Sequence, residues 1–157
     1  MTKNLIFFLL IILLSACQSE PTEEKQKLDE QPTVTFSYED EEIDSNNIKG
    51  CFVDDCSEEN AFVERINHSE FTEGLEPPEV KHGDEIKVEI NGQEPTEVYY
   101  SRNFDEGTTT QDHTLNGNKI EIHGEGTEQY FMVFKWYNEN DEFLGALSKA
   151  FEIEVIN

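Results

Sequence analysis

Two groups of closely spaced carboxylates are the side chains with the clearest chemical potential in this 157-residue sequence. The first group is Glu39-Asp40-Glu41-Glu42 with Asp44, and the second consists of Asp54, Asp55, Glu58 and Glu59. Calcium takes about six to eight oxygen ligands from loops, so either group could supply several. The D-x-[DN]-x-[DN]-G spacing of an EF-hand is absent, however, and the alternative is a solvated acidic surface. Ca²⁺ is the one cofactor that the sequence offers, and no other is expected.

Paired carboxylates are also the machinery of glycoside hydrolases, in which one group acts as an acid and the other as a base or nucleophile. Asp112 or Glu121, together with Glu125, is the pair that this sequence provides. A small hydrolase is therefore kept as an alternative function.

Nucleophilic catalysis has less support. No serine lies in a Gly-x-Ser-x-Gly elbow. Cys51 and Cys56 do not have C-x-x-C spacing, and their neighbours are acidic, whereas reactive thiols lie in electropositive surroundings. His68-Ser69-Glu70 matches only the H-x-E half of the zinc deaminase signature. We therefore expect that the protein is not an enzyme.

The N-terminus contains a cysteine of a different kind. Lys3 precedes an apolar run from Leu5 to Leu14, which is too short to cross a bilayer, because a spanning helix needs about 20 residues. It has the length of the hydrophobic region of a secretory signal. The following Leu14-Ser15-Ala16-Cys17 resembles the lipobox of bacterial lipoproteins. That resemblance implies a signal peptide over residues 1–16, and a diacylglyceryl group on Cys17 that holds the protein on the extracytoplasmic face of the cell membrane.

Cys51 and Cys56 are left as an even pair in an oxidising compartment, which predicts a disulfide between them. Zinc is a weaker interpretation, because a second pair of ligands at finger-like spacing is missing. The four histidines, His68, His82, His113 and His123, are scattered along the sequence.

The charge balance limits the partners that this protein can bind. The sequence has 11 Lys and Arg against 35 Asp and Glu, a net charge of −24, and loss of Lys3 with the signal peptide makes it about −25. Nucleic acid is bound by neutralising phosphates with Lys and Arg, so it is not an expected partner. Basic proteins and cationic peptides are favoured. The alternative is that the charge only keeps a surface protein soluble.

Composition divides the mature chain into two parts. Residues 17–32 contain the cysteine to be lipidated and a polar, acidic segment with one large apolar residue, Leu28. Such a segment cannot bury enough surface to offset its ordering entropy, so we expect a flexible linker. Residues 33–157 have the length of one domain.

The periodicity of this domain is mostly two. Apolar residues alternate with hydroxyls in Thr33–Tyr38 and with charges in Glu85–Ile90, which predicts half-buried strands. Asn91-Gly92 and Asn116-Gly117 predict turns, because both residue types tolerate positive φ.

The C-terminal part reads as a β-hairpin around a turn at Asn138–Asp141. Its first strand places four large side chains on one face: Tyr130, Met132, Phe134 and Trp136. Its second strand also places large apolar side chains on one face, namely Phe143, Leu147, Phe151, Ile153 and Val155. The aromatic residues Tyr99, Tyr100, Phe131 and Tyr137 either pack in the core or a cross-strand ladder, or present rings for binding.

Six to eight short strands predict an all-β fold, an antiparallel β-sandwich of the immunoglobulin or fibronectin-III type. The one helical candidate is Ser57–Ile66, where a serine cap precedes apolar residues at helical spacing.

Several features together resemble a loosely defined group of functionally undefined lipoproteins from Gram-positive bacteria of the Bacillus type. They are Lys49-Gly50-Cys51 with Cys56, Gly83-Asp84-Glu85-Ile86 entering a strand, Pro95 after it, and the terminal aromatic hairpin. The likeness covers residues 33–157 and implies an immunoglobulin-like domain, but it carries over no catalytic residue.

These observations lead to one expectation of function. We expect a membrane-anchored extracytoplasmic lipoprotein whose domain is a non-catalytic binding or accessory module for a basic protein, a peptide or an envelope component. The alternatives are a Ca²⁺-binding surface domain and a small envelope hydrolase that uses paired carboxylates.

Overall fold

The computed structural model describes residue 28 and residues 30–52, 56–104, 108–109, 113–115 and 117–157. The expected signal peptide, Cys17 and most of the expected linker lie outside these residues, as do Asp54, Asp55, Asp112 and Asn116. Within the described residues, no helix is long and apolar enough to span a membrane.

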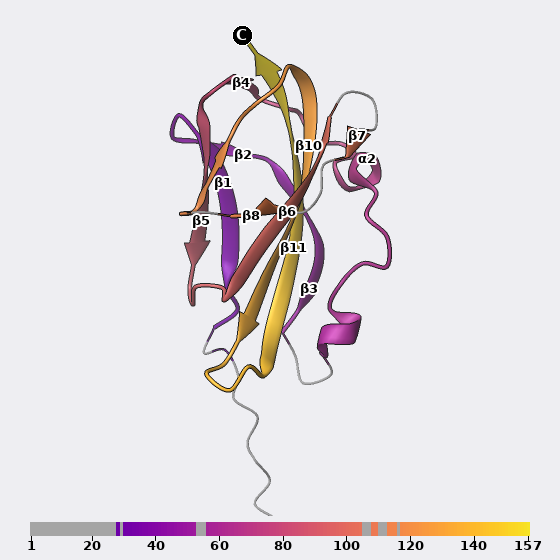
Figure 1. Cartoon of the computed structure of the whole chain (residues 1–157), viewed down its shortest axis with the longest axis vertical. Coiled ribbons are helices and arrows are strands. Elements are labelled where there is room, and N and C mark those ends of the chain that lie inside the picture. The colour runs from indigo at the N-terminus through magenta and orange to yellow at the C-terminus, as the bar shows by residue number, and fades with distance from the viewer. Residues whose placement is uncertain (1–27, 29, 53–55, 105–107, 110–112, 116) are drawn as a thin grey trace, which may run out of the picture.

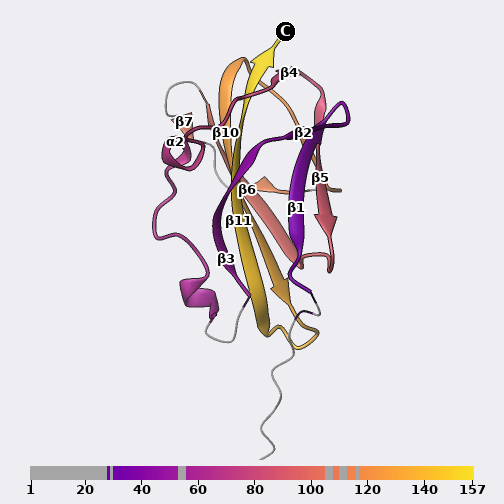
Figure 2. The same ribbon diagram turned by 180° about the vertical axis from the view of Figure 1, so that it is seen from behind.

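Two mostly antiparallel sheets pack against each other (Figure 1, and from behind in Figure 2). The smaller sheet has the order β2-β1-β5-β9, with β1 Thr33–Tyr38, β2 Glu41–Ile43, β5 Glu85–Asn91 and β9 Lys119–Glu121. The larger sheet has the order β3-β11-β10-β6-β7, with β3 Ser45–Cys51, β11 Phe143–Ile156, β10 Gly126–Tyr137, β6 Glu97–Phe104 and β7 Thr108–Thr109. To it are added β4 (Glu79–Lys81), parallel to β11, and β8 (His113–Thr114), which pairs with β6. The predicted all-β antiparallel sandwich is confirmed.

Residues at alternate positions form the interior between the sheets, as the period of two predicts. Phe36 on β1 and Val88 on β5 are register partners, and both are buried. Across the interior, the Phe36 ring lies 4.5 Å from the ring of Phe151 on β11, which stacks on Tyr130 of β10 at 4.8 Å. Burial of each such side chain stabilises the fold by roughly 1.5–3 kcal/mol, so this aromatic stack is a main contact between the sheets.

The long hairpin of β10 and β11 is the centre of the larger sheet. All four side chains predicted to face inward from β10 are fully buried: Tyr130, Met132, Phe134 and Trp136. From β11, four of the five predicted residues join the same core: Leu147, Phe151, Ile153 and Val155. The prediction for Phe143 is wrong, because the register shifts at the end of β10 and Phe143 packs with Cys51 and Ala146 in a separate cluster.

The larger sheet is also buried on its outer face. Phe131, Val133 and Ala150 point away from the sandwich interior and are covered by the segment that joins β3 to β4, whose apolar side chains include Phe62, Val63 and Phe71. The Phe71 and Phe131 rings are 5.2 Å apart. Both sides of this sheet are therefore core.

The covering segment does not form the helix predicted for Ser57–Ile66. It contains a 3₁₀ turn, η2 (Glu58–Asn60), and one short helix, α2 (His68–Phe71). The Asn67 side chain caps α2 by accepting a hydrogen bond from the Glu70 backbone. The prediction is wrong because the apolar residues of this segment pack on the outer face of the larger sheet, which does not require them to line up along one side of a helix.

One buried cation lies between the sheets. Lys149 on β11 is 8% exposed, and its Nζ donates a 2.7 Å hydrogen bond to the Val34 carbonyl. Strand β2 pairs only with Phe36–Tyr38 of β1, so it does not reach that carbonyl. Burial lowers the pKa of Lys149.

Cys51 and Cys56 form a disulfide, with Cα atoms 5.4 Å apart, in agreement with the sequence prediction. Cys51 ends β3 and packs with Ala61 and Ala146, so the bridge fixes the start of the covering segment against the larger sheet.

We expect the double variant Cys51→Ser/Cys56→Ser to unfold with a free energy about 2 kcal/mol below that of the wild type, because the bridge restricts a short loop of the unfolded chain. Urea denaturation with an unchanged m value checks this. A reducing agent should lower the stability of the wild type to that of the variant and leave the variant unaffected. Equal stability of the two oxidised proteins would contradict the prediction.

Candidate functional site

A groove of about 470 Å³ lies at the start of β6, on the side where β8 pairs with that strand. We call it the β6 groove, and it is lined by Glu94, Pro95, Thr96, Glu97, Val98, Tyr99, Thr114, Leu115 and Asn118. One wall is the β5–β6 connection with the start of β6, and the other is β8 with the connection to β9. The groove lies where the chain passes from the larger sheet back to the smaller one.

Hydrogen bonds hold both walls of the β6 groove in place. The Leu115 N–H donates to the Val98 carbonyl at 3.1 Å, and the Val88 N–H donates to the Asn118 carbonyl at 2.9 Å. On the other wall, the Thr96 N–H donates to the Lys135 carbonyl at 2.8 Å. The groove is thus part of the rigid sheet framework and does not have to be ordered by a ligand.

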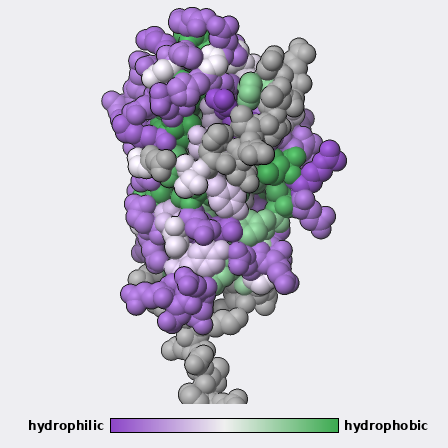
Figure 3. All heavy atoms as spheres, in the orientation of Figure 1, coloured by the Kyte–Doolittle hydropathy of each residue, from purple (hydrophilic) through white to green (hydrophobic). Residues whose placement is uncertain are grey.

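The lining combines charge with apolar surface. Glu94 and Glu97 are exposed carboxylates, while Val98, Tyr99 and Leu115 are partly buried. Acids beside an aromatic ring and apolar side chains suit a long cationic side chain, whose stem packs on apolar surface while its charged end meets the acids. Figure 3 shows hydrophilic residues over most of both ends of this face of the molecule, with less polar residues across its middle.

Lys135 of β10 already illustrates this kind of contact. Its Nζ lies 4.8 Å from the centre of the Phe62 ring and 5.5 Å from that of Tyr99. The same nitrogen is 3.3 Å from a Glu58 carboxylate oxygen and 3.7 Å from one of Glu97. Burial works to lower the pKa of Lys135, but the field of Tyr99 and the hydrogen bond to Glu58 hold that pKa above its ordinary value. Lys135 is therefore a cation held between rings and carboxylates.

The structure describes Glu58 and Glu59 of the second acidic group, while Asp54 and Asp55 lie outside the described residues, so the calcium site stays a prediction. Glu58 and Glu59 lie on η2, and the Glu58 carboxylate accepts hydrogen bonds from Tyr137 at 2.6 Å and from Lys135. The Tyr137 hydrogen bond is the main cause of a lowered pKa of Glu58. Burial, followed by the contact with Glu58, raises the pKa of Tyr137 to about 12. Over the part of the chain that the structure describes, no three His, Cys, Asp or Glu side chains form a group that could hold a metal ion.

The first acidic group lies around the turn between β1 and β2, at the β2 edge of the smaller sheet. Glu39, Glu41 and Glu42 line a second, smaller groove of about 260 Å³ with Tyr38 and Glu79. Two of its acids have cationic neighbours, since Lys81 lies 3.9 Å from Glu39 and Lys87 lies 3.1 Å from Asp40.

The structure describes two of the three carboxylates that the hydrolase prediction names, Glu121 and Glu125. Glu121 lies beside His123, with 3.5 Å between oxygen and nitrogen, and Glu125 accepts a hydrogen bond from Asn157. Neither carboxylate lines either of the two grooves above, and Asp112 is outside the described residues. The hydrolase stays a prediction.

The aromatic residues divide between core and groove. Phe131 is buried on the outer face of the larger sheet, and Tyr100 lies 6.0 Å from Tyr130 against the central core. Tyr137 is bonded to η2 through Glu58, so Tyr99 is the member of this set that lines the β6 groove.

A serine–histidine contact was not foreseen from the sequence. His68 Nε2 of α2 lies 3.0 Å from Ser101 Oγ of β6, the distance that a nucleophile and its base require. Both side chains are under 9% exposed, so a substrate cannot reach them. Neighbouring contacts are structural as well, since Thr72 and Gln129 both donate to the Glu152 carboxylate. This polar network fastens α2 to the sheet, and its partners come from distant strands, so spacing in the sequence could not reveal it.

Glu128 is a second buried polar residue that the sequence did not single out. It is fully buried on the inward face of β10, where Tyr130 donates a 2.6 Å hydrogen bond to Oε2 and Arg102 lies 3.5 Å away. Burial is the main cause that raises the pKa of Tyr130. The other oxygen, Oε1, has no hydrogen-bond partner among the described residues and lies against Gly124, where a Cβ atom would clash with it. This group closes one end of the core.

No protein-family model matches the chain, and no curated protein or solved structure is significantly similar to it. The resemblance to Bacillus-type lipoproteins therefore stays a prediction.

The buried histidine predicts a pH dependence. Burial lowers the pKa of His68 below its ordinary value of 6.5, so the unfolded chain binds this proton more readily than the folded one. The stability that neutral His68 contributes is complete above about pH 6.5 and is lost as the pH falls from there through the lowered folded-state pKa. In urea denaturation at pH 7.5, 6.5 and 5.5, His68→Gln should therefore lose less stability on acidification than the wild type.

Ser101→Ala is the control for this measurement. It removes the hydrogen-bond partner but keeps the imidazole, so it should be less stable than the wild type at every pH and retain most of its pH dependence. A stability difference between wild type and His68→Gln that stays constant from pH 7.5 to 5.5 would contradict the assignment.

Proposed function

We propose that this protein is a lipid-anchored extracytoplasmic module that binds a cationic peptide, or a basic segment of another protein, in the β6 groove. The observation that carries the proposal is the lining of that groove, in which Glu94 and Glu97 occur together with Tyr99 and the apolar side chains of Val98 and Leu115. The domain acts by binding and not by catalysis.

The chemistry of the groove matches lysine and arginine side chains. An ammonium or guanidinium over an aromatic ring is stabilised by about 0.5–1 kcal/mol at an exposed site, and an exposed ion pair contributes up to about 1 kcal/mol. Lys135 supports this reading, because its Nζ lies 5.5 Å from the centre of the Tyr99 ring and 3.7 Å from a Glu97 oxygen. Two or three basic residues, each with such contacts, would give a specific if moderate affinity.

The charge of the whole molecule favours the same partner. With 35 acids against 11 Lys and Arg, the surface attracts cations. Some of the few basic side chains also form ion pairs with acids: Lys87 pairs with Asp40, and Lys119 pairs with Glu85. Long-range attraction of this kind speeds association and weakens with salt, since the screening length is about 8 Å at physiological ionic strength.

Membrane attachment rests on the lipobox around Cys17. A linker of about 15 residues has an r.m.s. reach on the order of 20 Å. It would join the sandwich at Thr33, the start of β1. A polar tether of that length lets an acidic domain stand clear of anionic headgroups while two acyl chains keep it at the surface.

The groove is tested with Glu94→Gln/Glu97→Gln in the full-length protein held in detergent micelles. The probe is a nine-residue peptide of alternating lysine and tyrosine, titrated calorimetrically at 50 and 500 mM NaCl. Loss of both carboxylates should weaken binding by about 1 kcal/mol, a factor of roughly five, and the high salt should weaken binding to the wild type.

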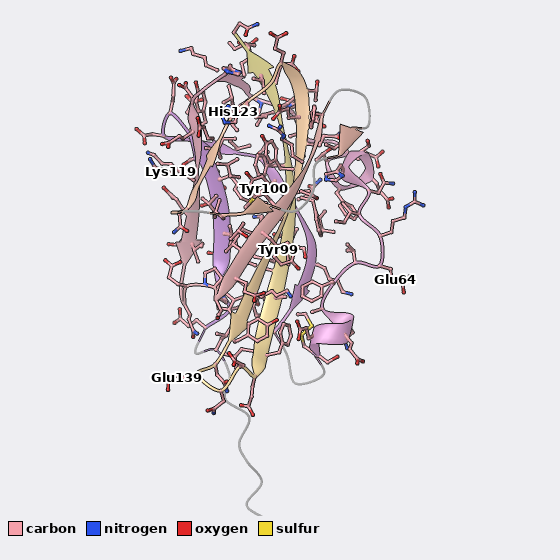
Figure 4. The ribbon with its side chains drawn as sticks, in the orientation of Figure 1. Glu64, Tyr99, Tyr100, Lys119, His123 and Glu139 are labelled. Atoms are coloured by element: carbon pink, nitrogen blue, oxygen red, sulfur yellow. A yellow bond between two sulfur atoms is a disulfide. The ribbon has the colours of Figure 1, made fainter. Side chains whose placement is uncertain are left out.

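The matched control is Glu64→Gln/Glu139→Gln, which changes the net charge equally. Figure 4 shows both of these acids well away from Tyr99. Equal weakening in the two double variants would mean that only net charge attracts the peptide. That result, or no binding to the wild type at low salt, would overturn the proposal.

The anchor is tested with Cys17→Ser expressed in a bacterium that lipidates exported proteins. The wild type should sediment with membranes and require detergent for release, whereas the variant should not, because it lacks the thiol that takes the lipid. Cys51→Ser/Cys56→Ser is the control and should remain with the membranes. If Cys17→Ser stays membrane-bound to the same extent as the wild type, the lipid anchor is refuted.

A further inference from the structure

Two of the four histidines that are scattered in the sequence meet at one end of the sandwich. His82 lies in the turn between β4 and β5, and His123 lies in the connection between β9 and β10. Their rings make an edge contact with centroids 5.8 Å apart, and both side chains are exposed. In Figure 4, His123 lies near the end of the molecule opposite Glu139. This pair is separate from the β6 groove.

Reciprocal backbone hydrogen bonds hold the two histidine-bearing loops together. The Gly83 N–H donates to the Ile122 carbonyl at 2.8 Å, and the Ile122 N–H donates to the Asp84 carbonyl at 2.9 Å. The His82 N–H is bonded to the carbonyl of Ile156, the last residue of β11. Residues directly beside each histidine are therefore fixed, so the ring contact follows from the fold and does not need a ligand to create it.

Each imidazole also has one nitrogen beside a hydrogen-bonding group of the protein. His82 Nδ1 lies 3.2 Å from the Gly124 carbonyl oxygen, to which a protonated Nδ1 donates, and 3.2 Å from the Gly124 amide nitrogen, whose N–H donates to an unprotonated Nδ1. His123 Nε2 lies 3.5 Å from a carboxylate oxygen of Glu121. Metal-binding histidines characteristically donate one ring N–H to a carbonyl or carboxylate, which fixes the tautomer and leaves the other nitrogen for the metal.

From this geometry we propose that His82 and His123 form a two-imidazole site for a divalent transition-metal ion such as Zn²⁺ or Cu²⁺. A metal bonded to imidazole nitrogen at about 2.0–2.1 Å lies roughly 3 Å from the ring centre, so one ion bridges centroids up to about 6 Å apart. The observed separation fits. In the bound state the His82 Nδ1–H donates to the Gly124 carbonyl, and its Nε2 binds the ion.

The choice of metal follows from the donor type. Imidazole suits Zn²⁺, Cu²⁺ and Ni²⁺, whereas Ca²⁺ and Mg²⁺ require oxygen ligands. The described residues contain no group of three or more metal-binding side chains, so water completes the coordination at this exposed site. Such a site binds and releases its ion readily, and the acidic surface raises the local concentration of cations.

The test is a calorimetric titration of the untagged full-length protein in detergent micelles with ZnCl₂ at pH 7.5, in 2 mM CaCl₂ to occupy carboxylates. One ion should bind per chain. His82→Asn and His123→Gln should each weaken the affinity at least tenfold, and the double variant should lose little more, because chelation requires both rings. His113→Ala, which removes a histidine on β8, should bind as the wild type does.

A second measurement does not depend on variants. With one equivalent of Cu²⁺, the electron paramagnetic resonance spectrum of the wild type should show superhyperfine coupling to two nitrogens, and acidification to pH 5 should abolish it because protons compete for imidazole. Three results would overturn the site: wild-type Zn²⁺ binding weaker than millimolar, affinity that changes less than twofold in both single variants, or a copper spectrum without nitrogen coupling.

Discussion

A strand that is buried on both faces has to be covered twice, and β11 is such a strand over Gly145–Phe151. Its inward side chains meet the smaller sheet through the contact between Phe36 and Phe151. Its outward side, with β10, needs a second layer, which the irregular segment between β3 and β4 supplies. The disulfide holds this segment down by a covalent bond, α2 does so by its buried polar contacts, and η2 by the hydrogen bonds that Glu58 accepts from Tyr137 and Lys135.

The same double burial explains where the charge lies. Apolar residues occupy both faces of the larger sheet, so acids are left for the loops, the strand ends and the outer face of the smaller sheet. On that sheet, Lys87 and Lys119 are paired with acids, which leaves an excess of carboxylate around them. An acidic residue reaches the core where it has a partner, as Glu128 does with Tyr130 and Arg102. The double burial of apolar residues thus leaves most charged side chains of the described residues on the surface, with Glu128 and Lys149 as buried exceptions.

The sequence predicted the features that depend on local periodicity. Alternation in Thr33–Tyr38 and in the even positions of β10 placed the inward side chains correctly, because in a strand the face is set by parity alone. Phe143 was misplaced by the register shift at the end of β10, which depends on pairing and not on period. The helix at Ser57–Ile66 failed for a related reason, since the sheet surface beneath it decides the conformation of this segment.

The candidate sites were beyond such reasoning because they join residues far apart in the chain. Val98 and Leu115 meet in the β6 groove through a hydrogen bond between their backbones. His82 meets His123 because Gly83 and Asp84 are bonded to Ile122, next to the two histidines. The spacing of these residues in the sequence therefore does not predict either contact. Scattered histidines looked uninformative for this reason, although two of them are neighbours in space.

Both candidate sites share one physical property, which is that backbone hydrogen bonds fix their walls before any ligand arrives. A preformed site avoids much of the ordering cost that weakens binding to flexible loops. At the histidine pair this rigidity extends into the core. Gly124, whose φ of 116° suits glycine, touches the His82 ring on one side and the buried Glu128 on the other. The Gly124 backbone that meets the His82 ring is thus itself packed against a fully buried carboxylate, which fixes the hydrogen-bonding partner of that imidazole in place.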